Sequence, residues 1–183
     1  MTSQDDVQEP HAMVVFESMF GNTEQVALAV ADGLQAEGVP TAVVEVSTAP
    51  AVLPPSVDLL VVGAPTHAFS LSRPKTRSEA VRQGADESKA AIGLREWLET
   101  VRPSADQPVH VAVYDTRATQ VRRLPAAAGP SAARLAKRRR FAGVDRPVAF
   151  LVADMQGPLV DGEIERATSW GRSLAALTRS ATR

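Results

Sequence analysis

One stretch decides the fold expected for this chain: Ser18-Met19-Phe20-Gly21-Asn22-Thr23. It follows an apolar run at residues 12–16 and precedes a helical pattern that starts near Glu24. In such a loop, between a strand and a helix, the backbone N–H groups turn inward and the helix N-terminus adds partial positive charge. The stretch therefore predicts a cradle for a phosphate group.

The residue types in this cradle narrow its ligand. No lysine follows Gly21, so the loop is not the P-loop of nucleoside triphosphatases, and the chain has no G-x-G-x-x-G dinucleotide motif. Ser18 and Thr23 offer hydroxyl groups, Asn22 offers an amide, and Gly21 allows close backbone approach. These neutral donors suit one terminal phosphate. The alternative is a simple helix cap made by Asn22 or Thr23.

Composition limits the class of protein. With 183 residues, 44% hydrophobic and 22% charged, the chain resembles one ordinary globular domain. It has no cysteine, which excludes disulfides, thiolate catalysis and cysteine-held metals or iron–sulfur clusters, and which favours a cytoplasmic setting. No apolar run approaches the ~20 residues of a transmembrane helix. The polar, acidic start does not resemble a signal peptide, so we expect a disordered tail at 1–11 and a single domain at 12–183.

Hydrophobic periodicity predicts strands and helices in alternation. Strands are expected at residues 12–17, 41–46, 57–63, 109–114 and 148–153. Helices are expected at residues 23–37, 88–101, 131–140 and 161–178, with a basic loop from residue 71 leading into the second of them. Residues 141–146 could extend either the third helix or the last strand. The alternation implies an α/β fold whose parallel sheet is covered on both faces.

Two further loops belong to the same end of the expected sheet, where ligands of open α/β sheets bind. In the loop at residues 63–70, Pro65 stiffens the strand exit, and His67 and Phe69 offer planar groups. His67 could equally be a surface residue, and Phe69 could cover core. In the loop at residues 114–118, Tyr114 offers a flat face with a polar tip, or else caps the core.

These three loops together resemble those of the flavodoxin family, over residues 12–178. The resemblance rests on Ser-x-x-Gly-Asn-Thr at 18–23, Gly-x-Pro-Thr at 63–66 and the Tyr-Asp pair at 114–115. The segment at residues 157–163 is similar to that of a group of actinobacterial flavodoxin-domain proteins. The family implies a flavodoxin-like three-layer sandwich with a five-stranded parallel sheet of order 2-1-3-4-5, an order for which flavodoxin is itself the type example, and bound FMN.

The resemblance assigns the binding residues in three groups. The FMN phosphate would be held by Ser18, Met19, Phe20, Gly21, Asn22 and Thr23. One side of the isoalloxazine would be flanked by Pro65, Thr66, His67, Ala68 and Phe69. The other side would be flanked, largely through backbone, by Tyr114, Asp115, Thr116 and Arg117. No catalytic side chain and no metal is expected, because the flavin itself carries the redox change.

The chain departs from the family pattern in three ways. The tip of the second loop, residues 67–70, has no glycine, so a peptide flip toward a reduced flavin would meet steric cost. The usual tryptophan of that loop is absent. Basic residues stand where flavodoxins are acidic: Arg73, Lys75, Arg77, Arg117, Arg122 and Arg123. They are either solvated loop residues or a basic rim that favours anionic partners.

Three functions stay open at this point. The leading expectation is an FMN-binding electron-transfer carrier. The alternatives are an NAD(P)H- or quinone-using FMN reductase, and thus an oxidoreductase, or a flavodoxin-fold domain that does not bind FMN and recognises another anionic ligand. The expected partner is a redox protein or a small anionic or quinone-like acceptor at the basic rim. Neither nucleic acid nor a membrane is expected, since the basic run at residues 137–140 lacks interleaved aromatic residues and suits a solvated helix end.

Overall fold

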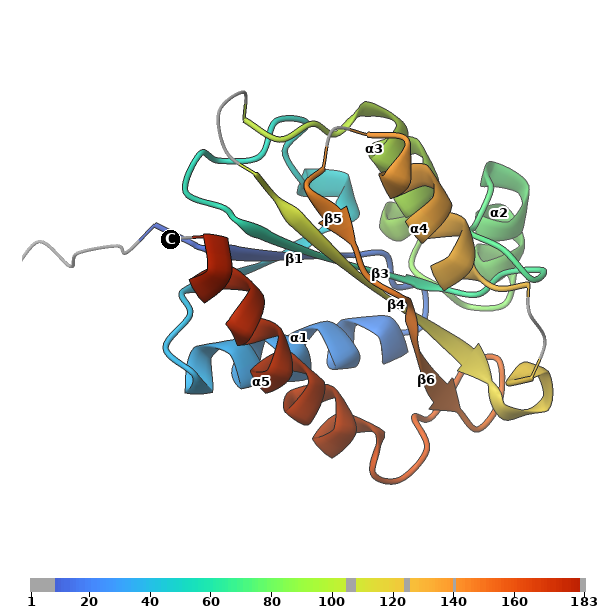
Figure 1. The fold of residues 1–183 in the computed structure, drawn as a ribbon. Coiled ribbons are helices and arrows are strands. Elements are labelled where there is room, and N and C mark those ends of the chain that lie inside the picture. The colour runs from blue at the N-terminus through green and yellow to red at the C-terminus, as the bar shows by residue number, and fades with distance from the viewer. Residues whose placement is uncertain (1–8, 105–107, 124–125, 140, 182–183) are drawn as a thin grey trace, which may run out of the picture.

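The computed structural model describes residues 9–104, 108–123, 126–139 and 141–181. A twisted parallel sheet lies between two layers of helices (Figure 1). Its strands are β1 (Ala12–Phe16), β2 (Thr41–Glu45), β3 (Leu59–Pro65), β4 (His110–Ala118), β5 (Gly143–Val144) and β6 (Val148–Val152). The helices are α1 (Asn22–Ala36), α2 (Pro74–Arg82), α3 (Leu94–Thr100), α4 (Ala128–Lys137) and α5 (Glu163–Ala181), with short 3₁₀ turns at Val46–Thr48, Glu87–Ala90 and Thr119–Val121.

The strand order is β2-β1-β3-β4, with β5 and β6 both pairing in parallel with β4. These two short strands together occupy the fifth position of the expected 2-1-3-4-5 order, so the flavodoxin-like α/β fold is confirmed. The break between them falls at residues 145–147, where Pro147 has no N–H to donate to a ladder. Residues 143–144 thus belong to the sheet, which settles the ambiguity in the sequence.

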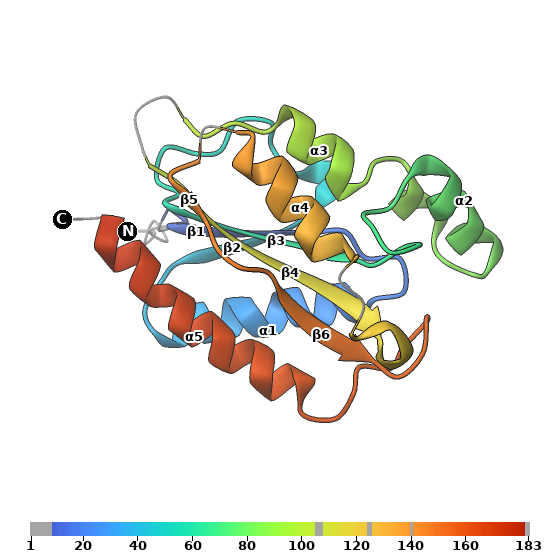
Figure 2. The same cartoon turned by 45° about the vertical axis from the view of Figure 1, so that its right-hand side comes forward.

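The core has two halves, one on each face of the sheet. Alternate residues of β1 divide between them: Val14 and Phe16 face α1 and α5, whereas Met13 and Val15 face α3 and α4. Buried central strands of this kind are covered by helices on both sides, as the two views show (Figure 2).

Helices α1 and α5 meet with their backbones in close approach. A Cβ added to Gly33 would overlap the Thr168 carbonyl, and one added to Gly171 would overlap that of Val30. Glycine is therefore needed at both crossing positions, and the approach fixes α1 beneath the sheet with its N-terminus at the carboxyl ends of the strands (Figure 1).

Side chains of α5 bond to the outer edge of β6. Glu163 Oε2 accepts a hydrogen bond from the Leu151 N–H at 2.7 Å, and Arg166 donates to the carbonyl of Ala149. The Arg166 guanidinium also pairs with Glu163 at 2.5 Å and lies 4.3 Å from the centre of the Phe150 ring. Backbone groups that a neighbouring strand would otherwise take are thus satisfied within the chain.

Several expected boundaries differ from the structure. The basic loop from residue 71 contains a helix, α2, that the sequence analysis missed. The helix expected at 88–101 is divided into a 3₁₀ turn and α3. His11, assigned to the tail, donates its N–H to Pro40 O, and its own carbonyl accepts from Asp58. The rest of that tail, residues 1–8, lies outside the described residues, as does Arg140 of the expected third helix.

Candidate functional site

A cavity of about 390 Å³ lies where β1, β3 and β4 end. This is the size of a small-molecule site, at the place where open parallel sheets bind ligands. The three expected loops contribute Ser18, Met19, Phe20, Asn22, Thr23, Pro65, Thr66, His67, Ala68, Phe69, Thr116 and Arg117. The remaining lining comes from α2 and its C-cap, and from the last residues of β4 and β6 with the segments that follow them: Thr76, Glu79, Ala80, Gln83, Ala118, Val121, Val152 and Met155.

The first loop leads into α1 through Gly21, whose φ of +87° is left-handed. Nothing lies within 4 Å of a Cβ built there, so backbone conformation rather than space demands glycine. The Gly21 N–H donates to Ser18 Oγ at 3.1 Å, and no side chain caps α1. The alternative of a simple cap by Asn22 or Thr23 is therefore wrong. The N–H groups of the first helical turn remain for an anion.

Two polar side chains of the cradle already have protein partners. Asn22 Nδ2 donates to the Gln156 carbonyl at 2.9 Å, and the hydroxyls of Thr23 and Thr116 are 2.8 Å apart. Ser18 Oγ accepts from Gly21 but keeps its own proton to donate. A phosphate monoester therefore fits this end through the α1 N–H groups and the Ser18 hydroxyl, while Asn22 holds the Gln156 segment in place.

The second loop closes in a tight turn at residues 67–70. The His67 N–H donates to Ser70 O at 2.9 Å, and the Ser70 N–H donates to His67 O at 3.0 Å. Between them, Ala68 and Phe69 have φ angles of 45° and 63°, in the left-handed region that L-residues avoid at about 1–2 kcal/mol each. Such strain persists where the surroundings impose it, and it concentrates at ligand sites. Phe69 lines the cavity with its side chain half exposed.

His67, beside this turn, lines the cavity as a neutral imidazole. Burial lowers the pKa of His67, and the positive charge of Arg77 lowers it further. One ring nitrogen is then a donor and the other an acceptor near neutral pH. The side chain can therefore hydrogen bond to a carbonyl or to a ring nitrogen of a planar ligand, without adding charge.

The Tyr114 side chain does not offer its flat face to the cavity, because it is fully buried in the core, as the alternative interpretation of this residue expected; a backbone contact with a ligand stays a prediction. β4 continues to Ala118, so Tyr114 is not at a strand end. Its ring occupies the space that a Cβ on Gly63 would need, and it stacks edge-on against Phe150 at 5.9 Å between centroids. Its hydroxyl donates to the Thr23 carbonyl at 3.0 Å, so it supports the first turn of α1 from below.

Asp115 is likewise buried and does not line the cavity. Its carboxylate pairs with Arg117 at 2.5 Å and accepts the Gly129 N–H, in the first turn of α4, at 2.9 Å. Arg117 lines the cavity, but its charge is balanced by this neighbour. The pair fixes the third loop against α4.

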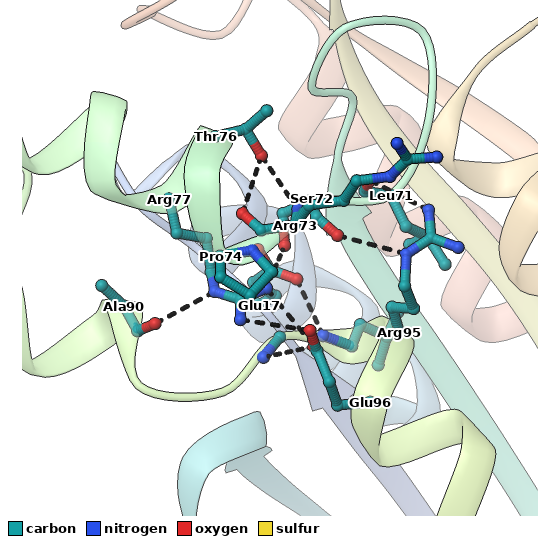
Figure 3. A network of polar contacts seen from close by, with 12 residues as sticks. Glu17, Leu71, Ser72, Arg73, Pro74, Thr76, Arg77, Ala90, Arg95 and Glu96 are labelled. Atoms are coloured by element: carbon teal, nitrogen blue, oxygen red, sulfur yellow. Dashed lines mark hydrogen bonds and ion pairs between the residues drawn. The ribbon is translucent and has the colours of Figure 1, made fainter.

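A buried polar network holds the first and second loops together (Figure 3). The Arg77 guanidinium, nearly inaccessible, donates to Ala90 O, to Ser72 Oγ and to both carboxylate oxygens of Glu96, at 3.0–3.3 Å. Figure 3 shows Glu17 close to this guanidinium. Arg77 is therefore not a solvent-facing rim residue, contrary to the sequence expectation.

Glu17, the residue before the cradle, is the most confined charge of the network. Its Oε2 accepts the Leu94 N–H at 2.8 Å, whereas its Oε1 has no hydrogen-bond partner among the described residues. Burial raises the pKa of Glu17, against the opposing effects of Ser72, the Leu94 N–H and Arg77.

Arg95 clamps the return limb of the second loop. It donates to Ser70 Oγ and to the carbonyls of Leu71 and Ser72, at 3.1–3.3 Å. Residues 70–72, which follow the strained turn, are thus held by a side chain of α3. Arg95 is more than twenty residues away in sequence, so no local pattern predicts this contact.

The described residues include no helix long and apolar enough to cross a membrane. Within the same ranges, no group of three or more histidine and acidic side chains could hold a metal ion.

The fold and this cavity define the class: an α/β protein with a ligand cradle at the switch point of its sheet. Residues 14–94 match the family described as Flavodoxin, so this part of the chain is similar to that family. A flavodoxin from the domain Archaea is similar at 17% identity, over 92% of this chain and 98% of that one, with a TM-score of 0.61. No curated protein matches the chain.

Two other solved structures show the same fold. Oxidised Flavodoxin 2 from Bacillus cereus is 16% identical over 92% of this chain and 97% of its own, with a TM-score of 0.60. Rubredoxin oxygen:oxidoreductase from Desulfovibrio gigas is 14% identical over 96% of this chain, with a TM-score of 0.61. This chain covers only 38% of that larger protein.

Proposed function

We propose that this protein binds FMN noncovalently in the cavity and serves as an electron-transfer carrier. One observation carries the proposal: an α1 N-terminus without a side-chain cap opens one end of a cavity of about 390 Å³. The other walls come from the loops after β3 and β4, as the family resemblance requires. FMN, when bound, supplies the redox chemistry, and the protein supplies binding and electrostatics.

The residues of the chain divide the work between the two ends of the cofactor. The N–H groups at the start of α1 and the Ser18 hydroxyl hold the phosphate. The turn with His67 and Phe69 flanks the ring on one side, and Thr116 with Arg117 flanks it on the other. Because His67 is neutral and Arg117 is paired with Asp115, these walls add little net charge beside the ring.

The carrier is favoured over a reductase by the exposure of the turn. Phe69 is 51% exposed while lining the cavity, so the ring end reaches the surface, where another redox protein could approach it. The similarity to the archaeal and Bacillus cereus flavodoxins extends over nearly the full length of both chains in each comparison.

FMN binding is tested by titrating the purified protein into FMN and following the quenching of flavin fluorescence. The proposal expects saturable binding of one FMN per chain. An unquenched titration and a colourless protein after FMN is added would overturn it.

The carrier is distinguished from the reductase by mixing the FMN-loaded protein with NADPH in a stopped-flow instrument. A carrier stays oxidised until a partner reductase is added. Rapid bleaching of the flavin by NADPH alone would favour the reductase instead.

A further inference from the structure

We infer that the rim of the cavity is a docking surface for an acidic redox protein, an inference that rests on the proposed function. The rim is defined by the exposed charged residues within three positions of a residue that lines the cavity on α2 or after β4 and β6: Arg73, Lys75, Glu79, Arg82, Asp86, Arg122, Arg123 and Asp154. Five are basic and three acidic, although the whole chain carries a net charge of −1. This face therefore carries charge opposite to that of the chain as a whole.

Ion pairs within the rim do not cancel its positive charge. Glu79 pairs with Arg82 at 2.6 Å. Among the described residues, no ion pair involves Arg73, Lys75, Arg122 or Arg123. Arg73 and Lys75 lie at the start of α2, a helix that lines the cavity, and the two arginines directly follow Val121, which lines it as well.

Two large apolar side chains that line the cavity are also exposed at the surface. Phe69 is 51% exposed and Met155 is 72% exposed, and both line the cavity. Both side chains are therefore available to a partner that covers the opening of the cavity. Aromatic residues and methionine inside a charged border reproduce the usual anatomy of a protein interface.

The placement of the charges favours a protein over a small anion. The four unpaired cations stand outside the cavity lining, so a small anion inside it would not reach them. The charged side chains that do line it are Glu79 and Arg117, each with a partner of opposite charge. Cations around the opening suit a broad acidic surface, which they would steer toward the ring end.

The first test compares two redox probes with the FMN-loaded protein: an acidic [2Fe–2S] plant-type ferredoxin and the basic cytochrome c. Reduced ferredoxin passes one electron to FMN, so its cluster is oxidised and the flavin reduced. In a separate reaction the reduced protein passes one electron to ferric haem. The bimolecular rate constants are measured by stopped flow at low and high salt.

We expect the two rate constants to depend on salt in opposite ways. The ferredoxin rate constant should fall about tenfold or more as salt rises, because screening removes the attraction, and the cytochrome rate constant should not fall. A ferredoxin rate that is insensitive to salt, or a cytochrome rate that falls instead, would overturn the inference.

A charge reversal places the effect on this face. The double variant R122E/R123E should lower the ferredoxin rate constant at low salt about tenfold or more, with FMN affinity unchanged. The matched control, R134E/R138E, makes the same charge change at exposed positions along α4 and should change the rate less than about twofold. Equal losses in both variants would show that net charge, rather than this rim, governs the rate.

A binding experiment without FMN tests the docking surface separately from FMN binding. The rim is made of protein alone, so oxidised ferredoxin should bind the full chain without FMN, measured by biolayer interferometry at low salt, and R122E/R123E should bind more weakly. If ferredoxin binds but FMN does not, the result contradicts the proposed function and supports the docking surface. If FMN binds but ferredoxin does not, the result contradicts the docking surface and leaves the proposed function intact.

Discussion

The two ends of the cavity are built from different parts of the chain. The end proposed to hold the phosphate is one continuous stretch, residues 18–23, with uncapped backbone N–H groups at the start of α1 and a single left-handed glycine. The ring end joins the strained turn at Ala68 and Phe69 to Thr116, and is held by side chains from α2 and α3. A short sequence motif is enough to build the first of these two ends. The ring end, in contrast, depends on contacts that form only in the folded chain.

The largest expected effect comes from breaking the network behind the ring end. Arg77→Met removes a buried cation from partly exposed Glu96 and from buried Glu17, and should lower the free energy of unfolding by about 3–5 kcal/mol, the range for a buried ion pair that loses one partner. Urea denaturation measures the loss. The control Arg82→Met, whose side chain is 68% exposed, should cost less than about 1 kcal/mol.

If Arg77→Met costs no more than Arg82→Met, the ring end does not depend on this network. The contrast between the two ends of the cavity would then fail.

The phosphate end is tested by adding a negative charge. Thr23→Asp places a carboxylate at the start of α1 and should weaken FMN binding at least about tenfold, because two anions would compete for the same N–H groups. Fluorescence titration gives the affinity, and a thermal melt checks that the variant is folded.

The control Ser173→Asp adds the same charge at an exposed position of α5 and should leave the FMN affinity unchanged. Unchanged affinity in folded Thr23→Asp would mean that the phosphate lies elsewhere.

A smaller effect concerns protonation at the ring end. Because the pKa of His67 is lowered in the folded state, the unfolded chain binds the extra proton first as pH falls. His67 thus contributes stability that is present above its ordinary pKa of about 6.5 and is lost as pH falls through and below it.

The measurement is the unfolding free energy of the native protein and of His67→Asn between pH 8 and pH 5. The difference between them should shrink toward acid pH. If the difference in unfolding free energy stayed constant over this range, His67 would not contribute to the pH dependence of stability.

The smallest effect tests the strain of the turn. Ala68→Gly relieves the left-handed backbone and should change stability by between zero and about +1 kcal/mol, since the relief is offset by the entropy of glycine in the unfolded chain. The control Ala91→Gly, at an exposed residue with φ of −63°, should lose about 0.5–1 kcal/mol. Chemical denaturation compares the two, and equal losses would show that the turn is not strained.

The difference between the two ends also explains what the sequence could predict. The loop at residues 18–23 and the start of α1 could be predicted because their signal is local, while the phosphate contact stays a prediction. Tyr114 was misplaced because the length of β4 depends on pairing with β6, a strand more than thirty residues farther along. Only that pairing turns an apparent strand end into a buried mid-strand position.

Helix α2 was missed for a related reason. Its sequence is polar, and its largest buried side chain is Arg77, which the sequence suggests should be solvated. The burial becomes favourable only once Glu96 and Ser72 are brought beside it by the fold. Pro74, a residue that suits the first turn of a helix, was the one local signal for its start.

The contacts of Glu163 and Arg166 with β6 have a consequence for how copies of this protein meet. An open strand edge offers a template on which a second chain can add its own strand, the first step of uncontrolled aggregation. Here a carboxylate takes the Leu151 N–H and a guanidinium takes the Ala149 carbonyl, so an incoming strand finds those ladder positions occupied. The β6 edge therefore resists sheet extension at these two positions.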